Sequence, residues 1–222
     1  MKNIFTTIIH TVLDILFPPA CVACNTRGAW LCTHCHTTLD HSHYRPDCNT
    51  IASTHFTGAA RQLVHRTKYR GAQEAGKTIA EIMYDICLED ISEYTQRYPG
   101  AQIVVTYIPT RNETLRERGF DHAHTIAQHF AGKMDVPLVP TLTHTKRIPR
   151  MAKTRSRATR EKLLNNSMKS ILTQPLSNTL LIIIDDVVTT GSTIREAQRA
   201  LHIHTTLPPL GVVFAHTPVK KY

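Results

Sequence analysis

The sequence predicts an α/β fold with a largely parallel sheet, joined to a small cysteine-rich region near the N-terminus. Short apolar runs at 102–108, 180–185 and 211–215 alternate with longer segments of helical spacing. Strands that alternate with helices are typical of parallel sheets with right-handed crossovers. The chain has 222 residues, which is enough for one α/β domain and a small appendage.

Apolar periodicity predicts the individual elements. The predicted helices cover 3–17, a segment that begins near Gly58, 72–94, 121–132 and 194–202, and the predicted strands cover 102–108, 136–142, 180–185 and 211–215. The span 41–53 is polar with little periodicity, and we interpret it as a linker. The predicted domains are therefore an N-terminal helix with a metal-binding region, 1–53, and a main domain, 54–222.

The apolar segment 1–19 is interpreted as an amphipathic helix that packs on the protein, with association at a membrane surface as the alternative. Its apolar residues form a helical stripe, but His10 and Asp14 interrupt the run and no small-residue cleavage site follows. No apolar stretch in the sequence approaches the ~20 residues that cross a bilayer. We therefore expect no membrane insertion and a cytoplasmic location.

The most informative stretch is LLIIIDDVVTTGST, residues 180–193. Its apolar part is typical of a strand that is buried on both faces. Asp185 and Asp186 then fall at the carboxyl end of this strand, where open α/β sheets bind ligands. A small, hydroxyl-rich turn follows and leads into a helix; its residues are Thr189, Thr190, Gly191, Ser192 and Thr193. The pattern predicts a phosphate cradle beside two acids that can accept hydrogen bonds from sugar hydroxyls. A strand that ends in an Asx-type turn with a Thr-rich N-cap is the structural alternative.

This stretch resembles the motif with which type I phosphoribosyltransferases bind phosphoribosyl pyrophosphate (PRPP). The resemblance implies that Asp185 and Asp186 are the catalytic acids and hold the ribose hydroxyls, while the turn 189–193 wraps the 5-phosphate. Departure of pyrophosphate from C1 gives oxocarbenium character, which carboxylates near the ribose stabilise. Mg²⁺, held by ligand oxygens and water, would neutralise the pyrophosphate.

A second motif consists of two C-x-x-C knuckles, CVAC and CTHC, formed by Cys21, Cys24, Cys32 and Cys35. Four thiolates in this arrangement suit a structural, tetrahedral Zn²⁺ ion. His34 or His36 could replace one sulfur, and a disulfide pair or a redox C-x-x-C are the alternatives. Zinc is favoured because nothing in the sequence suggests export and cytosolic thiols stay reduced.

Together the motifs resemble the ComF family, in which a zinc finger precedes a Rossmann-like phosphoribosyltransferase-like domain. Further matches are FPP at 17–19, KYRG at 68–71 and RGFDH at 118–122. The resemblance implies a second anion site, for the pyrophosphate of PRPP or the phosphates of a related phosphosugar, in the stretch 111–118 that ends at Arg118. Lys68 could reach the same ligand, and an ordinary surface lysine is the alternative. The resemblance also implies a link to DNA uptake in natural competence and a helicase-like ComFA partner. The family's usual run is RGFNQ, so this chain departs from it at Asp121 and His122.

The net charge of +9 is concentrated between Lys146 and Lys169, where nine basic residues and one acid give +8. This excess is more than one pyrophosphate requires, and it favours contact with single-stranded DNA. The predicted DNA-binding residues are Arg150, Lys153, Arg155, Arg157 and Arg160. A lid over PRPP and a solvated basic loop are the alternatives. Because the segment has no aromatic residue, any DNA contact should be electrostatic and independent of sequence.

The sequence therefore favours a PRPP-binding, ComF-type protein that is linked to DNA uptake. Two other functions stay open, namely an active phosphoribosyltransferase on an unidentified acceptor and a non-catalytic docking module for a helicase. The acid pair favours ligand binding over pure docking, because a scaffold has no need of ribose-binding carboxylates.

Overall fold

The computed structural model describes residues 18–44, 49–68, 73–145 and 166–217. The predicted helix over 3–17 lies outside the described residues, as do the predicted DNA-binding residues between Arg150 and Arg160. Within the described part of the chain, none of the helices has the length and apolar character needed to cross a membrane.

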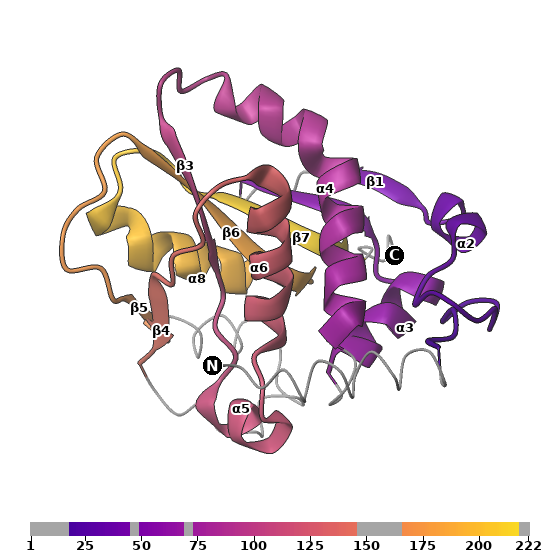
Figure 1. Ribbon diagram of the computed structural model, residues 1–222. Coiled ribbons are helices and arrows are strands. Elements are labelled where there is room, and N and C mark those ends of the chain that lie inside the picture. Colours follow the sequence, from indigo (N-terminus) through magenta and orange to yellow (C-terminus); the bar gives the residue numbers. More distant parts are fainter. Residues whose placement is uncertain (1–17, 45–48, 69–72, 146–165, 218–222) are drawn as a thin grey trace, which may run out of the picture.

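A five-stranded sheet forms the centre of the molecule, with the order β1-β2-β7-β6-β3 (Figure 1). These strands are β1 (His41–Tyr44), β2 (Thr50–His55), β7 (Leu210–His216), β6 (Thr179–Val188) and β3 (Gln102–Tyr107). The last four are parallel to one another, and β1 runs antiparallel to β2 at the edge of this sheet. The predicted α/β class with a largely parallel sheet is thus confirmed.

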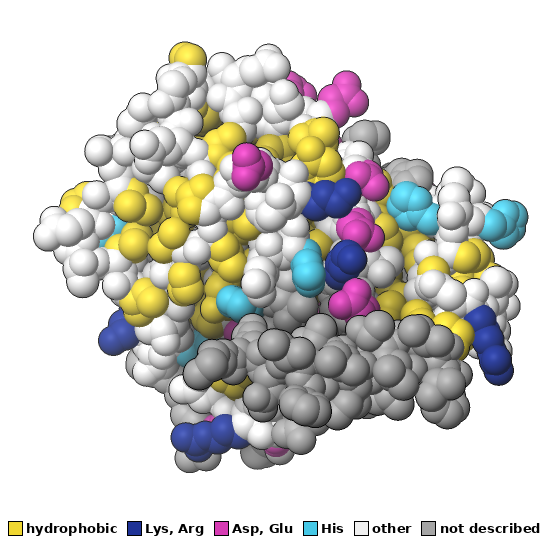
Figure 2. All heavy atoms as spheres, viewed as in Figure 1, with side chains coloured by type: hydrophobic (Ala, Val, Ile, Leu, Met, Phe, Trp, Pro, Cys, Tyr) yellow, Lys and Arg dark blue, Asp and Glu magenta, His cyan; other side chains and the backbone are white. Residues whose placement is uncertain are grey.

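Helices cover both faces of the sheet. On one face lie α3 (Gly58–Thr67), α4 (Gln73–Thr95) and α6 (His122–Met134), and on the other lies α8 (Ser192–Leu201). Figure 1 shows α4 and α6 side by side in front of the sheet. Figure 2 shows acidic and basic side chains close together in the region of α4 and α6 on the face in view.

Strand β6 is buried on both faces, which explains its continuous apolar composition. Ile182 and Ile184 pack into the cluster under α4 and α6, while Leu181 and Ile183 pack into the cluster under α8. All four side chains are fully buried. The strand is longer than predicted, since it continues past the acid pair to Val188.

The linker predicted over 41–53 is wrong, because β1 and most of β2 lie in it. Strand β2 is buried but contains Thr and Ser, so its sequence lacks an apolar run. Hydrogen bonds satisfy these side chains: the Thr54 hydroxyl donates to the Asp40 carbonyl oxygen at 2.8 Å, and the Ser53 hydroxyl to that of Val213 at 3.4 Å. The predicted boundary between residues 53 and 54 therefore falls inside a strand of the sheet.

The strand predicted over 136–142 is also wrong. Only Leu138 pairs with the sheet, through an isolated parallel bridge to Val105. Strand β4 (Leu142–His144) instead pairs antiparallel with β5 (Met168–Ser170) in a separate two-stranded sheet. Glu196 of α8 fastens this small sheet, because its buried carboxylate accepts a hydrogen bond from the Met168 N–H at 3.0 Å.

Three short helices complete the described elements. They are α2 (Thr33–Thr37), α5 (Asn112–Arg118) and the 3₁₀ helix η2 (His202–His204). Helix α5 follows β3 and brings Arg118 to the carboxyl edge of the sheet, the same edge at which β6 ends. This edge is where the fold assembles its polar side chains.

Candidate functional site

The end of β6 carries the predicted acid pair and runs directly into the small turn. Asp185 and Asp186 lie within the strand, and α8 begins at Ser192, after the N-cap Gly191. Gly191 has φ 71°, a left-handed conformation that glycine adopts without strain. The turn is held by the Thr190 and Ser192 hydroxyls, 2.9 Å apart. The predicted strand, acid pair, turn and helix therefore follow one another in the predicted order.

The remaining residues of the turn differ in exposure. Thr189 is exposed, whereas Thr193 is half-buried on the first turn of α8. The Arg195 guanidinium donates to the Thr190 carbonyl oxygen at 2.8 Å and so fixes the turn from the helix side. The turn precedes the first turn of α8, where backbone N–H groups and the helix dipole favour an anion.

Two basic side chains from distant segments contact Asp186. Lys68, which caps the carboxyl end of α3, places Nζ 3.3 Å from Asp186 Oδ2. His122, the first residue of α6, places Nε2 3.3 Å from the same oxygen. The side chains of His122 and Asp186 are only 12% and 13% exposed, so these interactions are largely shielded from solvent.

The two neighbouring acids have opposite titration behaviour. Burial and the charge of Asp186 raise the pKa of Asp185 well above its usual value. Burial acts in the same direction on Asp186, but the hydrogen bond from His122 and the charge of Lys68 outweigh it and lower the pKa of Asp186. Asp186 is thus the stable anion of the pair, and Asp185 the acid that more readily holds a proton.

His122 is itself held by a network at the start of α6. The carboxylate of Asp121, the N-cap, accepts hydrogen bonds from the backbone N–H groups of Ala123 and His124. It also accepts from the Thr110 hydroxyl at 2.8 Å and from the Thr110 N–H at 3.0 Å. Arg118 Nη1 lies 3.3 Å from His122 Nδ1.

The structure therefore brings Lys68 and Arg118 to the acid pair, Lys68 directly and Arg118 through His122. We call the five residues Asp185, Asp186, Lys68, His122 and Arg118 the acid-pair site. Sequence reasoning gave no role to His122, nor to its neighbours Thr110 and Asp121. The departure of RGFDH from the family's RGFNQ was the signal that could have identified the histidine.

The four cysteines of the two knuckles form a compact cluster. All four sulfur atoms lie within 4.8 Å of one another, and the Sγ atoms of Cys24 and Cys32 are 3.6 Å apart. A tetrahedral zinc ion with Zn–S bonds of about 2.3 Å would separate its sulfurs by about 3.8 Å. Cys21 and Cys35 are buried, whereas Cys24 is exposed. The four thiols are thus close enough together to bind a zinc ion.

The local backbone favours a thiolate in this cluster. Burial opposes ionisation of Cys21, but backbone N–H groups of Cys24, Cys32 and Ala23 lower the pKa of this thiol to about 6. The other thiols act oppositely on Cys35 and, together with burial, raise its pKa to about 12. A cation among the four sulfurs would relieve this mutual repulsion.

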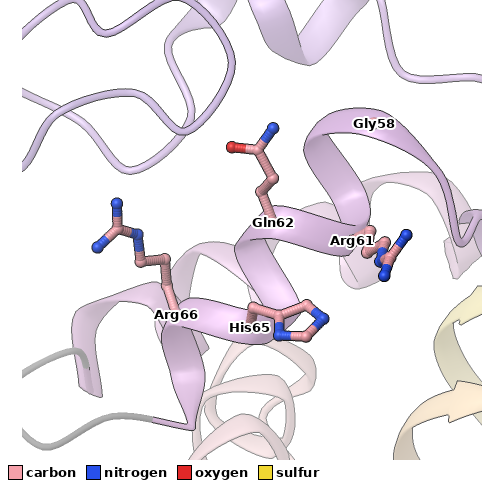
Figure 3. Close-up of a pocket in the computed structure, with 5 residues that line it drawn as sticks. All are labelled: Gly58, Arg61, Gln62, His65 and Arg66. Carbon is pink, nitrogen blue, oxygen red and sulfur yellow. The ribbon is translucent and has the colours of Figure 1, made fainter.

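A pocket of about 550 Å³ lies on the exposed side of α3 (Figure 3). Its described lining consists of Gly58, Arg61, Gln62, His65 and Arg66. Arg61 and Arg66 point in different directions from the helix, so they suit an extended polyanion better than a single ion. The same helix ends at Lys68, which links this basic surface to the acid-pair site.

Comparison with characterised proteins gives one clear sequence relative. The chain is 28% identical to the competence protein ComFC of Bacillus subtilis over 141 residues, which cover 64% of this chain and 52% of ComFC. The resemblance to the ComF proteins is confirmed. The match spans about half the length of ComFC, and no protein-family model matches this ComF-like chain.

Solved structures similar to this ComF-like chain include two phosphoribosyltransferases. Hypoxanthine phosphoribosyltransferase from Staphylococcus aureus is 17% identical, with a TM-score of 0.34 over 63% of this chain and 65% of the other. Adenine phosphoribosyltransferase from Leishmania donovani is 14% identical, with a TM-score of 0.37 over 78% of this chain and 72% of the other.

Proposed function

We propose that this chain binds PRPP, or a related phosphosugar, at the acid-pair site. The observation that carries the proposal is the acid pair at the end of β6, followed immediately by the turn into α8. Asp186 would accept hydrogen bonds from the ribose hydroxyls, and the turn 189–193 would hold the 5-phosphate. Lys68 and Arg118 supply positive charge for the pyrophosphate on the other side of the site.

The burial of the acids favours ligand binding over a purely structural role. Two adjacent carboxylates at a half-buried edge destabilise the fold unless each finds compensating partners. Asp186 has two basic partners, Lys68 and His122, whereas burial and Asp186 disfavour the ionised form of Asp185. A ligand that donates hydroxyl groups would compensate Asp185, and this is the chemistry of a ribose.

Mg²⁺ fits this proposal as a partner of the ligand. Bound to pyrophosphate oxygens and water, it would neutralise the charge of the leaving group. The protein's own part is to orient the ribose and to stabilise positive charge at C1 through the carboxylates. With an acceptor present, the same geometry would support transfer of the phosphoribosyl group. Without one, the protein would be a ligand-binding accessory factor.

We propose a structural Zn²⁺ ion at Cys21, Cys24, Cys32 and Cys35. The spacing of the sulfurs and the local support for a thiolate at Cys21 favour it over a disulfide. A cytoplasmic location fits these thiols, because that compartment keeps them reduced. A knuckle of this kind also offers a rigid surface on which a helicase-like ComFA partner could dock.

We propose contact with single-stranded DNA, linked to DNA uptake, as a second function. The predicted contacts Arg150, Lys153, Arg155, Arg157 and Arg160 lie outside the described residues. Among the described residues, the basic pocket on α3 supports this function, because its guanidinium groups can bind successive phosphates.

Titration calorimetry with PRPP and Mg²⁺ tests the main proposal. We expect Asp186→Asn to weaken binding by about 10- to 150-fold, since a hydrogen bond to a charged group contributes about 1.5–3 kcal/mol. Asp135→Asn is the matched control, because Asp135 is an exposed acid in a left-handed conformation that asparagine tolerates. Equal affinities of Asp186→Asn and the wild type would refute the ribose assignment.

A further inference from the structure

His122 has hydrogen-bond partners at both ring nitrogens, and these partners differ in whether they need a hydrogen on the nitrogen. Nε2 lies 3.3 Å from Asp186 Oδ2. Nδ1 lies 3.2 Å from Thr110 Oγ1 and 3.3 Å from Arg118 Nη1. Because the side chain is only 12% exposed, water is a poor substitute for these partners.

The two contacts at Nδ1 exclude each other. The only hydroxyl hydrogen of Thr110 is donated to Asp121, so Thr110 Oγ1 can only accept a hydrogen bond from Nδ1. Arg118 has donors alone, so its guanidinium can only donate to a Nδ1 that carries no hydrogen. One nitrogen therefore bonds either to Thr110 or to Arg118, according to its protonation.

The contact at Nε2 decides which tautomer the neutral ring adopts, and therefore which partner Nδ1 has before and after protonation. The ionised carboxylate of Asp186 needs a hydrogen on Nε2, so the neutral imidazole carries its proton there and leaves Nδ1 to Arg118. The imidazolium carries hydrogens on both nitrogens. It then donates from Nδ1 to Thr110, loses the lone pair that Arg118 used and repels the guanidinium charge.

We propose that His122 is a positioning residue that couples uptake of a proton to the transfer of Arg118 from His122 to a phosphate group of the ligand. The inference rests on the proposed function, since it assigns a role within PRPP binding. The charged groups around His122 are Asp186 and Asp185 on β6, Lys68 at the end of α3, Arg118 on α5 and Asp121 before α6. A pyrophosphate adds negative charge to this set and so favours the imidazolium.

The coupling has a measurable consequence, because histidines titrate between pH 5 and 8. Binding of PRPP should be accompanied by uptake of a proton, and the affinity should fall as the pH rises from 6 to 8. Linkage to a single proton limits the fall to about tenfold per unit of pH. In the His122→Gln variant a side-chain amide can still donate to Asp186 but cannot titrate, so this contribution to the pH dependence disappears.

The test is calorimetry with PRPP and Mg²⁺ between pH 5.5 and 8.5, in pairs of buffers that differ in ionisation enthalpy. Three proteins are compared: the wild type, His122→Gln and the matched control His124→Gln. His124 is the next histidine on α6 and packs against the Tyr107 ring, with centroids 5.3 Å apart. The ligand's own phosphates titrate in all three titrations, so the difference between proteins isolates His122.

The expected result is that His124→Gln follows the wild type, while His122→Gln binds PRPP with a flatter pH profile and takes up fewer protons. Identical profiles for the wild type and His122→Gln would overturn the inference while leaving PRPP binding intact. Absence of PRPP binding by the wild type at every pH would overturn the proposed function, and the role of His122 in it.

A measurement on the ligand-free wild-type protein tests the inference even if the His122→Gln variant does not fold. In long-range ¹H–¹⁵N spectra of histidine-labelled wild-type protein, the neutral ring of His122 should carry its proton on Nε2 at pH 8. The signal is assigned by its absence in His122→Gln, or in His122→Asn if the first variant fails to fold. A neutral ring with its proton on Nδ1 at pH 8 could not accept a hydrogen bond from Arg118. That result would contradict the proposed transfer of Arg118 from His122 to the ligand.

Discussion

The cysteine cluster and the acid-pair site are assembled over very different lengths of chain. The four sulfurs come from 15 consecutive residues, 21–35, and a short hairpin is enough to bring them together. The acid-pair site draws on the end of α3, the end of α5, the start of α6 and β6. The first region depends on local geometry and a metal, whereas the second depends on the whole sheet and its helices.

This contrast also appears in the charges. In the cysteine cluster, thiols raise the pKa of a neighbouring thiol, and a bound cation would remove the repulsion. In the acid-pair site the protein supplies its own basic partners, Lys68 and His122, to one acid of the pair. We therefore expect a substitution in one region to leave the ligand or metal binding of the other region unchanged. The following four experiments test this in order of decreasing effect.

The largest expected effect is loss of the metal. Cys35→Ser should reduce the bound zinc from about one ion per chain to near zero, because a hydroxyl does not replace a thiolate ligand. Metal analysis gives the stoichiometry, and hydrogen exchange should show lost protection near residues 20–40. Cys87→Ala, which removes a buried cysteine of α4 outside the cluster, is the control that should keep its zinc. If PRPP binding vanishes together with the zinc, the two regions are not separable.

The next effect concerns the two acids, whose substitutions should change stability in opposite directions. The lowered pKa of Asp186 means that its stabilisation is present above its unfolded-state pKa and is lost as the pH falls through the lower folded-state pKa. At pH 8, Asp186→Asn should therefore lower the free energy of unfolding, by about 1.5–3 kcal/mol for a lost charged hydrogen bond.

The raised pKa of Asp185 has the reverse consequence. Its contribution is fully present below the unfolded-state pKa and is lost as the pH rises through the raised folded-state pKa. Asp185→Asn should therefore raise the free energy of unfolding at pH 8 and have less effect near pH 4. Urea unfolding of both variants at the two pH values measures this, and a shared sign at pH 8 would contradict the assignment.

A smaller effect is expected at the N-cap of α6. Asp121→Ala removes the acceptor for two backbone N–H groups and for Thr110, which should lower stability by about 1–2 kcal/mol. Because Asp121 also sets the position of His122, PRPP affinity should fall, while the zinc content stays unchanged. Thermal unfolding, calorimetry and metal analysis on one preparation measure all three. Unaltered PRPP affinity would show that the cap acts on the helix alone.

The smallest effect is expected on the α3 surface. The double variant Arg61→Gln and Arg66→Gln should reduce the slope of log affinity for single-stranded DNA against log salt by about 1.4, since each phosphate contact contributes about 0.7. Arg97→Gln removes one charge from a surface pair with Glu93 and is the control. An unchanged slope would exclude α3 from the DNA contact. Zinc content and PRPP affinity should not change.

Which features the sequence could predict depended on how far apart their residues lie. The apolar run of β6, the acid pair and the turn are contiguous, and the structure has the predicted order. Strand β2 was missed because its buried Thr and Ser side chains are satisfied by hydrogen bonds that a hydropathy pattern does not reveal. The segment 136–142 is apolar enough for a strand, but only Leu138 pairs with the sheet.

The sequence by itself determined the fold class, the acid pair with its turn, and the cysteine cluster, because each is encoded by neighbouring residues with strong local preferences. The tertiary structure alone decided that Lys68 and His122 share one oxygen of Asp186, and that Thr110 and Arg118 compete for one nitrogen of His122. These contacts join residues up to 118 positions apart, because parallel strands bring their carboxyl ends to the same edge of the sheet. Residues of separate sequence motifs therefore contact one another, and form one site, only in the folded protein.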